Sequence, residues 1–340
     1  MKMKTRNPLP VLALVAALSA CNGATATQEA VPQELAVRAA SEGMTRGYVA
    51  GNALTDTDPT LLHSSSSPSS RTIYLTAWHY RQSGGSEKYF TNEAFTQNGN
   101  GEEDGLWHHV PQLYWPVGGQ LEFLAYSCSI PFPESSVAWG GTRTTDCVYL
   151  TVDKRYTQDD ILFANAGGTW DELAHNAWVP LTFRHAQAWI QFVFHSVDAE
   201  FDGIVSVEEL ILKDIYTSGV LKVEHPYGPA EGKWTYRFDE RFDTTVDDNN
   251  GVYSTSVTTT DMYMDMLIPE QKMKDIVLLY RIVGTEPLME YDFELPHTDT
   301  WQMGKKYVYD ITFAPRRINV SLSISNWDGG GSYTPYVPEI

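Results

Sequence analysis

Residues 306–313 read KYVYDITF, and this stretch shows most clearly the pattern that decides the fold. Its large apolar side chains, Tyr307, Tyr309, Ile311 and Phe313, occupy every second position. Successive side chains of a β-strand point to opposite faces of the sheet, so these four fall on one face. The stretch therefore predicts a β-strand with one buried face.

Runs of the same kind recur along the chain. They are rich in Val, Ile, Thr, Tyr, Phe and Trp, which fit the half-buried surface of a sheet. They cover residues 71–80, 120–127, 179–195, 205–216, 233–238, 275–283, 288–295 and 317–327. Clusters of Gly, Asn, Asp and Pro separate them, and the best helical candidate, residues 169–177, is short. Many short strands with frequent turns predict an all-β fold built from antiparallel β-sandwiches.

The length suggests two domains, because 340 residues with 42% hydrophobic positions can form two cores. We expect a lipoprotein signal peptide over residues 1–20 and a tether over residues 21–34. An N-terminal β-sandwich over residues 35–172 and a C-terminal β-sandwich over residues 173–340 would follow. The tether is predicted because its residues are small and polar and have no periodicity.

The charge balance limits the partners of this protein. Asp and Glu number 43 against 24 Lys and Arg, which gives a formal net charge of -19. Nucleic acids and anionic lipid surfaces attract basic proteins. We therefore exclude nucleic acid as the main partner.

The N-terminus carries an export signal. Lys2, Lys4 and Arg6 precede the apolar run VLALVAAL at residues 11–18, which is too short to span a bilayer. The Leu-Ser-Ala-Cys sequence that ends at Cys21 is similar to the bacterial lipobox. This resemblance implies that Cys21 is lipidated and that the mature chain is anchored to the outer membrane by its lipid.

Two further cysteines, Cys128 and Cys147, remain after Cys21. An even pair in an oxidising compartment can form a disulfide, but the sequence does not supply the required geometry. The alternative is two separately buried thiols, and both interpretations stay open.

Signatures of catalysis are missing. The chain contains no GxSxG, HExxH, GxxxxGK[ST] or CxxC motif. His108 and His109 are adjacent, and neighbours on a strand point to opposite faces, so they cannot easily share one metal ion. Among 43 acidic residues, groups such as the FDERFD run that contains Asp239 are expected by chance. We predict that the protein is not an enzyme and uses no cofactor.

One stretch matches the spacing of a calcium-binding loop. Residues 198–209 place Asp198, Asp202 and Glu209 at positions 1, 5 and 12 of an EF-hand loop, although position 3 is Glu200. An EF-hand needs helices on both sides, whereas the flanking sequences predict strands. A hairpin loop is the preferred interpretation, and these three acids remain a weak calcium candidate.

The ten tryptophans raise the alternative of a glycan-binding surface, because exposed aromatic rings can stack on sugars. Trp189, Trp301 and Trp327 lie beside apolar strand positions, so we expect them in the core. Four others lie at strand ends or in loops, where either role is open: Trp107, Trp115, Trp139 and Trp178.

A set of short motifs follows an order and spacing found in a known family. They are YFTN at 89–92, LYWP at 113–116, LEFLAY at 121–126, DILFA at 160–164, VPLTFRHA at 179–186, LIPEQ at 267–271, WQMG at 301–304, YVY at 307–309 and ISNW at 324–327. In these motifs the chain resembles the fimbrillin-like (Mfa-like) lipoproteins of Bacteroidetes, the subunits of type V pili. The resemblance spans nearly the whole mature chain.

This resemblance implies two tandem transthyretin-like sandwiches and an N-terminal strand that occupies a groove. In polymerising members of the family, a protease cuts after an arginine that follows this strand, and a strand from a neighbouring subunit then fills the groove. Here residues 33–39 (QELAVRA) are the expected strand and Arg46 is the expected cleavage site. Arg38 is the alternative, although cleavage there would cut the strand itself.

We therefore predict a fimbrial structural or accessory subunit, or an adhesin, on the cell surface. Its partners would be other fimbrial subunits, joined by donor-strand exchange, and a ligand on a host or bacterial surface. The alternative is a surface lipoprotein that binds glycans. The C-terminal residues 332–340 include Pro335 and Pro338, which cannot donate hydrogen bonds to a sheet, so they would make a poor donor strand.

Overall fold

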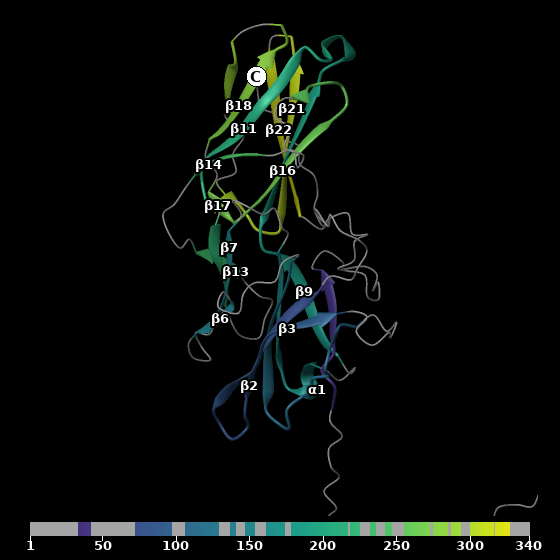
Figure 1. Cartoon of the computed structure of the whole chain (residues 1–340), viewed down its shortest axis with the longest axis vertical. Coiled ribbons are helices and arrows are strands. Elements are labelled where there is room, and N and C mark those ends of the chain that lie inside the picture. The colour runs from purple at the N-terminus through teal and green to yellow at the C-terminus, as the bar shows by residue number, and fades with distance from the viewer. Residues whose placement is uncertain are drawn as a thin grey trace, which may run out of the picture. The chain divides into compact units, whose positions relative to one another are not determined.

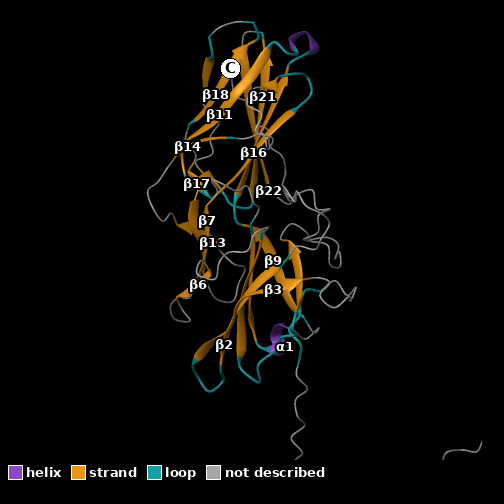
Figure 2. Ribbon diagram, viewed as in Figure 1, coloured by secondary structure: helices purple, strands orange, loops and turns teal. Residues whose placement is uncertain are grey.

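The computed structural model describes residues 33–41, 72–96, 106–128, 137–140, 147–153, 161–173, 178–216, 218–224, 232–235, 242–246, 255–272, 275–284, 287–293, 300–315 and 317–326. Nearly every regular element in these ranges is a strand (Figure 2). The helical elements among them are the single turns α1 (Trp170–Leu173) and η2 (Ala199–Phe201). The all-β prediction is therefore confirmed. None of the helices in the described ranges has the length and apolar character needed to cross a bilayer.

The largest described sheet has seven strands and is built from residues 37–185 (Figure 1). Its order is β1-β9-β8-β5-β2-β3-β4. The strands are β1 (Val37–Ser41), β2 (Ile73–Tyr80), β3 (Ser86–Thr96), β4 (His108–His109), β5 (Gln120–Ser127), β8 (Leu162–Gly168) and β9 (Val179–His185).

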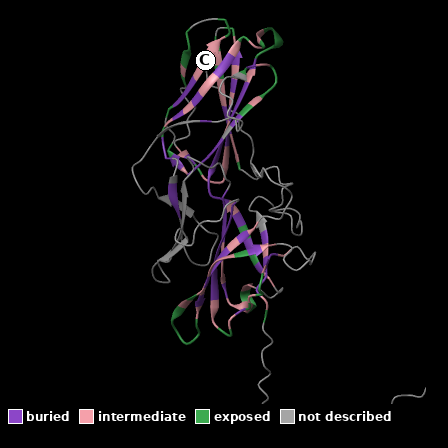
Figure 3. Cartoon of the chain, viewed as in Figure 1, coloured by how far each residue is buried: buried purple, intermediate pink, exposed green. Residues whose placement is uncertain are grey.

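One face of this sheet forms the first hydrophobic core. In β9, Val179, Leu181 and Phe183 are buried, whereas Pro180 and Thr182 between them are exposed. This alternation follows from the two-residue repeat of a strand, and Figure 3 shows buried positions concentrated along the strands. The buried side chains of β9 join those of β2, β5 and β8 in one cluster, so the strands cooperate in burying a common surface.

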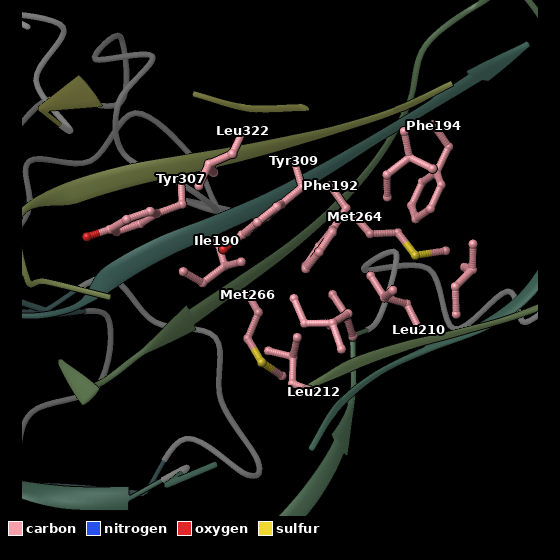
Figure 4. Packing of buried hydrophobic residues seen from close by; sticks show 14 of the residues in the cluster. Ile190, Phe192, Phe194, Leu210, Leu212, Met264, Met266, Tyr307, Tyr309 and Leu322 are labelled. Carbon is pink, nitrogen blue, oxygen red and sulfur yellow. The ribbon is translucent and has the colours of Figure 1, made fainter. Parts of the chain in front are cut away.

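The second core lies between two further sheets. One has the order β16 (Met262–Ile268), β10 (Ala188–Ser196), β21 (Lys305–Ala314) and β22 (Arg317–Asn326). The other has the order β14 (Phe242–Thr245), β11 (Val205–Ile215), β18 (Ile276–Ile282) and β19 (Met289–Phe293), and β15 (Thr255–Ser256) also pairs with β11. Side chains of β10, β16 and β21 pack against those of β11 in this core (Figure 4).

The strand predicted from KYVYDITF is β21. Tyr307, Tyr309, Ile311 and Phe313 are each at most 3% exposed and all belong to the second core. The hydroxyl of Tyr309 accepts a hydrogen bond of 2.9 Å from the indole nitrogen of Trp301, which is fully buried. The polar atoms of these large rings are therefore satisfied inside the core, as buried tyrosine and tryptophan require.

Two strand pairs are parallel, β1 with β9 and β10 with β21, whereas the prediction was of antiparallel sheets. The other pairs of described strands are antiparallel. Both parallel pairs join strands that lie far apart in the sequence. Alternation of apolar residues is the same in a parallel and an antiparallel strand when one face is exposed, so the sequence did not distinguish them.

The predicted division at residues 172 and 173 needs correction. It would separate β9 from the sheet and from the core to which β9 belongs. The change from the first core to the second comes after His185, where β9 ends and β10 follows. Moreover, a four-stranded sheet crosses this point in the sequence. It joins β13 (Gly232–Thr235) and β12 (Ser218–Glu224) to β7 (Cys147–Asp153) and β6 (Val137–Gly140).

A buried glutamine supports the short pair of β17 (Gln271–Lys272) and β20 (Thr300–Trp301). Gln271 is 5% exposed. Its side-chain amide bonds the backbone of Tyr216 in the way that a neighbouring strand would. Its oxygen accepts from the Tyr216 amide at 2.7 Å, and its nitrogen donates to the Tyr216 carbonyl at 2.7 Å. Burial of these polar backbone groups is tolerated because each has a partner.

Candidate functional site

The N-terminal segment, residues 33–41, is paired along both edges. On one side, β1 pairs with β9 in parallel, from Val37 opposite Val179 to Ser41 opposite Phe183 (Figure 1). On the other side it contacts the closing segment, which we define as residues 106–119. Backbone bonds of 2.8–3.1 Å join the two segments: Leu35 N to Leu113 O, Val37 N to Trp107 O, Trp107 N to Val37 O, and Trp115 N to Gln33 O.

These contacts close the first sheet on itself. The closing segment includes β4, which is the last strand of the sheet, and β1 is the first. Because the N-terminal segment bonds to both β9 and the closing segment, it joins the two ends of the sheet. Without it, both neighbours would expose unpaired backbone N–H and C=O groups.

The same segment fills an apolar groove. Leu35 and Val37 are fully buried, Ala39 is 5% exposed, and all three belong to the first core. Burial of a leucine or valine side chain contributes about 1.5–3 kcal/mol each. The segment therefore supplies both the hydrogen bonds and the apolar surface of one missing strand.

Polar side chains fix the segment at both ends. Glu34 accepts hydrogen bonds from Nδ1 of His108 at 3.1 Å and from Nε2 of Gln112 at 3.2 Å, and both partners lie in the closing segment. At the other end, the guanidinium of Arg38 lies 4.3 Å from the ring centre of Trp178, directly before β9. Such a cation–π contact contributes about 0.5–1 kcal/mol.

The closing segment is in turn fastened to β2 and β3. Nε2 of His79 lies 2.9 Å from the carbonyl oxygen of Gly118, and Nε2 of His109 lies 2.9 Å from the carboxylate of Glu93. The hydroxyl of Tyr89 donates to the carbonyl of Tyr114. Burial raises the pKa of Tyr89, so its hydroxyl keeps the proton that it donates.

The end of the closing segment leaves no space for a side chain. Gly119 has a φ of +80°, and a Cβ atom at this position would lie 2.3 Å from the carbonyl oxygen of Tyr80. Only glycine adopts this backbone conformation readily and permits this approach to β2.

A surface ion pair lies at the turn between β2 and β3, close to His79. Arg81 donates to both carboxylate oxygens of Glu87, and His79 lies 3.3 Å from one of them. The hydrogen bond from Arg81, and secondly that from His79, lowers the pKa of Glu87. Glu87 therefore carries its charge at neutral pH and orients His79 toward the closing segment.

Several predicted site residues lie outside the described residues. These are Cys21, Arg46 and Asp239, and the signal peptide and most of the tether lie there as well. Arg38, the alternative cleavage arginine, lies within β1. Cleavage there would therefore cut the strand itself.

The structure does not test the predicted disulfide between Cys128 and Cys147, because the side chain of Cys147 lies outside the described residues. Cys128 is buried directly after β5. The backbone of Cys147 lies in β7, opposite Glu224 on one side and Gly140 on the other. The formation of this bond in the oxidised protein stays a prediction.

The weak calcium candidate lies in a strand–loop–strand unit instead of an EF-hand. Asp198 caps the turn η2 and accepts from the amide of Glu200 at 2.9 Å. Asp202 accepts from the hydroxyl of Ser196 and the amide of Thr259, each at 2.6 Å, and Glu209 lies inside β11. Both loop carboxylates therefore serve to hold the loop. Among the described residues, no group of three or more His, Cys, Asp or Glu is arranged to bind a metal ion.

The described tryptophans are mostly part of the cores. Trp189 and Trp301 are buried, as predicted, and Trp107 and Trp115, for which either role was open, are at most 9% exposed. Trp178 is partly buried under Arg38. Trp327 lies outside the described residues, as does the side chain of Trp139. Burial removes Trp107 and Trp115 as sugar-stacking surfaces.

The sequence did not reveal how the closing segment holds the N-terminal segment. The family resemblance implied a strand over residues 33–39. Glu34, His108 and Gln112 carry no local signal of their contact, because they come from distant parts of the chain. His108 and His109 have different partners, Glu34 and Glu93, in agreement with the predicted opposite faces.

Comparison with known proteins agrees with this fold. A candidate cell adhesion protein from Bacteroides uniformis is similar, with a TM-score of 0.50, 16% identity, and coverage of 86% of this chain and 98% of its own. A fimbrial assembly protein from Parabacteroides distasonis (TM-score 0.46, 11% identity, coverage 90% and 100%) also matches. So does a C-terminally truncated form of the tip fimbrial protein Mfa3 from Porphyromonas gingivalis (TM-score 0.40, 9% identity, coverage 87% and 100%).

No curated protein matches the chain. The model of one protein family, described as fimbrillin-like, matches residues 66–327, which is most of the sequence. This match covers β2 to β22, and therefore the second core and all of the first core except the residues of the N-terminal segment. The chain belongs to the fimbrillin-like family.

Proposed function

We propose that the protein is a non-enzymatic fimbrial subunit or adhesin of the cell surface, and that its N-terminal strand is exchanged for a strand of a neighbouring subunit. The observation that carries this proposal is the position of residues 33–41, which complete the first sheet between β9 and the closing segment. Family membership supports the fimbrial role. We further propose that lipid on Cys21 anchors the chain to the outer membrane.

The physical argument is that the N-terminal segment can be replaced without unfolding the rest of the first sheet. The other six strands are bonded to each other through their own pairs, from β9 to β4. Removal of the segment would leave an apolar groove with two unpaired strand edges, which a strand from another chain could satisfy in the same way. A donor strand on a different surface from the groove would make a head-to-tail contact that does not close, so a filament would grow.

For release of the segment, we propose cleavage after Arg46. Arg38 lies within β1, paired with Pro180 of β9, and its side chain stacks on Trp178. The backbone at Arg38 is paired with β9, and its neighbour Val37 also bonds to Trp107, so this part of the chain is less accessible to a protease. These contacts favour Arg46, which follows the strand in the sequence.

The proposal can be tested with purified mature chain and a trypsin-like protease. We expect trimming next to residue 46, followed by SDS-resistant ladders of subunits. Arg46→Gln should abolish the trimming and the ladders, whereas the matched variant Arg38→Gln should retain both. Ladders that form equally in Arg46→Gln would refute cleavage at this site, and trimming without any ladder would refute strand exchange.

Anchoring by lipid has its own test. In cells grown with labelled palmitate, the wild-type chain should carry the label and fractionate with the outer membrane. Cys21→Ser should lose both properties. Label that persists in Cys21→Ser would overturn the assignment of Cys21.

A further inference from the structure

A cavity of about 470 Å³ opens at one end of the second core. It is lined by the loop between β10 and β11, by β18 and β19, and by the turn between β21 and β22. Most of its lining side chains are apolar or aromatic, among them Phe201, Tyr280, Tyr291, Phe313 and Ile318. Small-molecule sites in proteins commonly have volumes of about 300–1,000 Å³ and linings of this kind.

The cavity exists because the two sheets are not joined at this side. Both β19 and β22 are the last strands of their sheets. Tyr280, Tyr291 and Ile318 pack against the second core but remain partly exposed, whereas Phe313 at the inner wall is 3% exposed. The inner wall of the cavity is thus formed by the protein core, and its outer walls are formed by partly exposed apolar side chains.

The surface around the opening is also apolar. Val197, Ile204 and Val283 are 40–54% exposed, which is unusual for such side chains in a chain with a net charge of -19. Backbone bonds tie them to the lining: Val197 N donates to Phe313 O at 2.9 Å, and Val283 N donates to Ile204 O at 2.8 Å. The exposed apolar side chains are therefore held in place by the strands that form the cavity.

The charge at the cavity is positive. Arg317 is the charged residue among the described residues that line it, and its side chain is exposed. Ser196 also lines the cavity, but its hydroxyl donates to Asp202 at 2.6 Å. The Asp202 carboxylate further accepts from the Thr259 amide, so its oxygen has hydrogen-bond donors within the loop. The exposed guanidinium of Arg317 can donate charge-assisted hydrogen bonds to an anion at the rim.

From this combination we propose that the cavity binds an amphipathic carboxylate, such as a fatty acid. The apolar chain would occupy the space between Tyr280, Tyr291 and Phe313, and the carboxylate would lie at Arg317. A neutral apolar ligand would leave the arginine unused, and a polar anion such as a free sugar acid would not match the apolar lining. This site is separate from the N-terminal segment, so the inference does not depend on strand exchange.

The test uses the full mature chain and titration calorimetry with dodecanoate below its micelle concentration. We expect saturable one-to-one binding. Arg317→Glu should weaken it by at least about tenfold, since it replaces a charge-assisted hydrogen bond by repulsion. Lys305→Glu is the matched control, because Lys305 lies at the far end of the same hairpin, opposite Asn326, and makes the same change of charge. It should bind dodecanoate within about twofold of wild type.

Two further measurements separate the parts of the proposal. Dodecanol, which lacks the charge, should bind wild type and Arg317→Glu equally. Ile318→Asp, which places a negative charge inside the apolar lining, should abolish binding of both ligands while the melting temperature shows that the variant is folded. The proposal is wrong if dodecanoate does not saturate, if Arg317→Glu and Lys305→Glu weaken binding equally, or if the folded Ile318→Asp variant still binds.

Discussion

Replacement of Leu35 by alanine tests whether the N-terminal segment opens independently of the rest of the fold. The leucine side chain is fully buried in the first core. Leucine-to-alanine changes at such sites cost about 2–5 kcal/mol, depending on how far the surroundings relax. If the segment opens locally, Leu35→Ala lowers the free energy of this local opening by the same amount. A decrease of about 2.7 kcal/mol would increase the population of the open state about 100-fold.

Hydrogen exchange measures this opening directly. The amides of Trp107, Trp115 and Val179 donate to carbonyl groups of the N-terminal segment, at 2.8–2.9 Å. In Leu35→Ala these three amides should exchange about 100-fold faster than in wild type. Amides between β5 and β8 should change much less, because the N-terminal segment does not pair with these strands.

The matched control is Ile190→Ala in the second core, where the side chain is equally buried. This change should lower the melting temperature but leave the ratio of exchange rates between the two groups of amides as in wild type. The reasoning would be refuted if Leu35→Ala accelerated the amides of β5 and β8 as much as those of Trp107, Trp115 and Val179. In that case the segment would open only with global unfolding, and strand exchange without unfolding would lose its basis.

Three further predictions concern single contacts. Gly119→Ala should destabilise the fold by more than about 2 kcal/mol, because a Cβ atom would clash with the β2 backbone. Gly84→Ala has a similar φ but open space around it, so it should cost about 1 kcal/mol. Thermal unfolding compares the two variants, and equal costs would contradict the clash. Glu87→Gln should lower the melting temperature near neutral pH, because Arg81 lowers the pKa of this carboxyl in the folded chain. Its contribution is present above the ordinary pKa and lost as the pH falls through the lowered pKa. The difference from wild type should therefore shrink as the solution is acidified, and the idea fails if it grows instead. Gln271→Met should cost about 2–4 kcal/mol in urea unfolding, because it removes two hydrogen bonds to buried backbone groups of Tyr216. A loss below about 0.5 kcal/mol would show that water replaces the amide.

The family resemblance implied a strand over residues 33–39, and the structure places β1 at Val37–Ser41 with Leu35 and Val37 buried. Cys21 and Arg46 lie outside the described residues and stay predictions. The contacts that hold the N-terminal segment were not predictable. Glu34 has no feature that selects His108 as its partner, and Trp107 and Trp115 stand in a segment where a core position and a surface position look alike.

The sequence by itself determined the all-β class and the buried face of strands such as β21, because alternation is a property of a few neighbouring residues. Only the tertiary structure decided that β1 pairs in parallel with β9, that β9 belongs to the first core, and that the closing segment completes the sheet. The physical reason is that an edge of a strand offers the same N–H and C=O groups to every partner. Which partner it meets depends on how distant parts of the chain bury their apolar faces together.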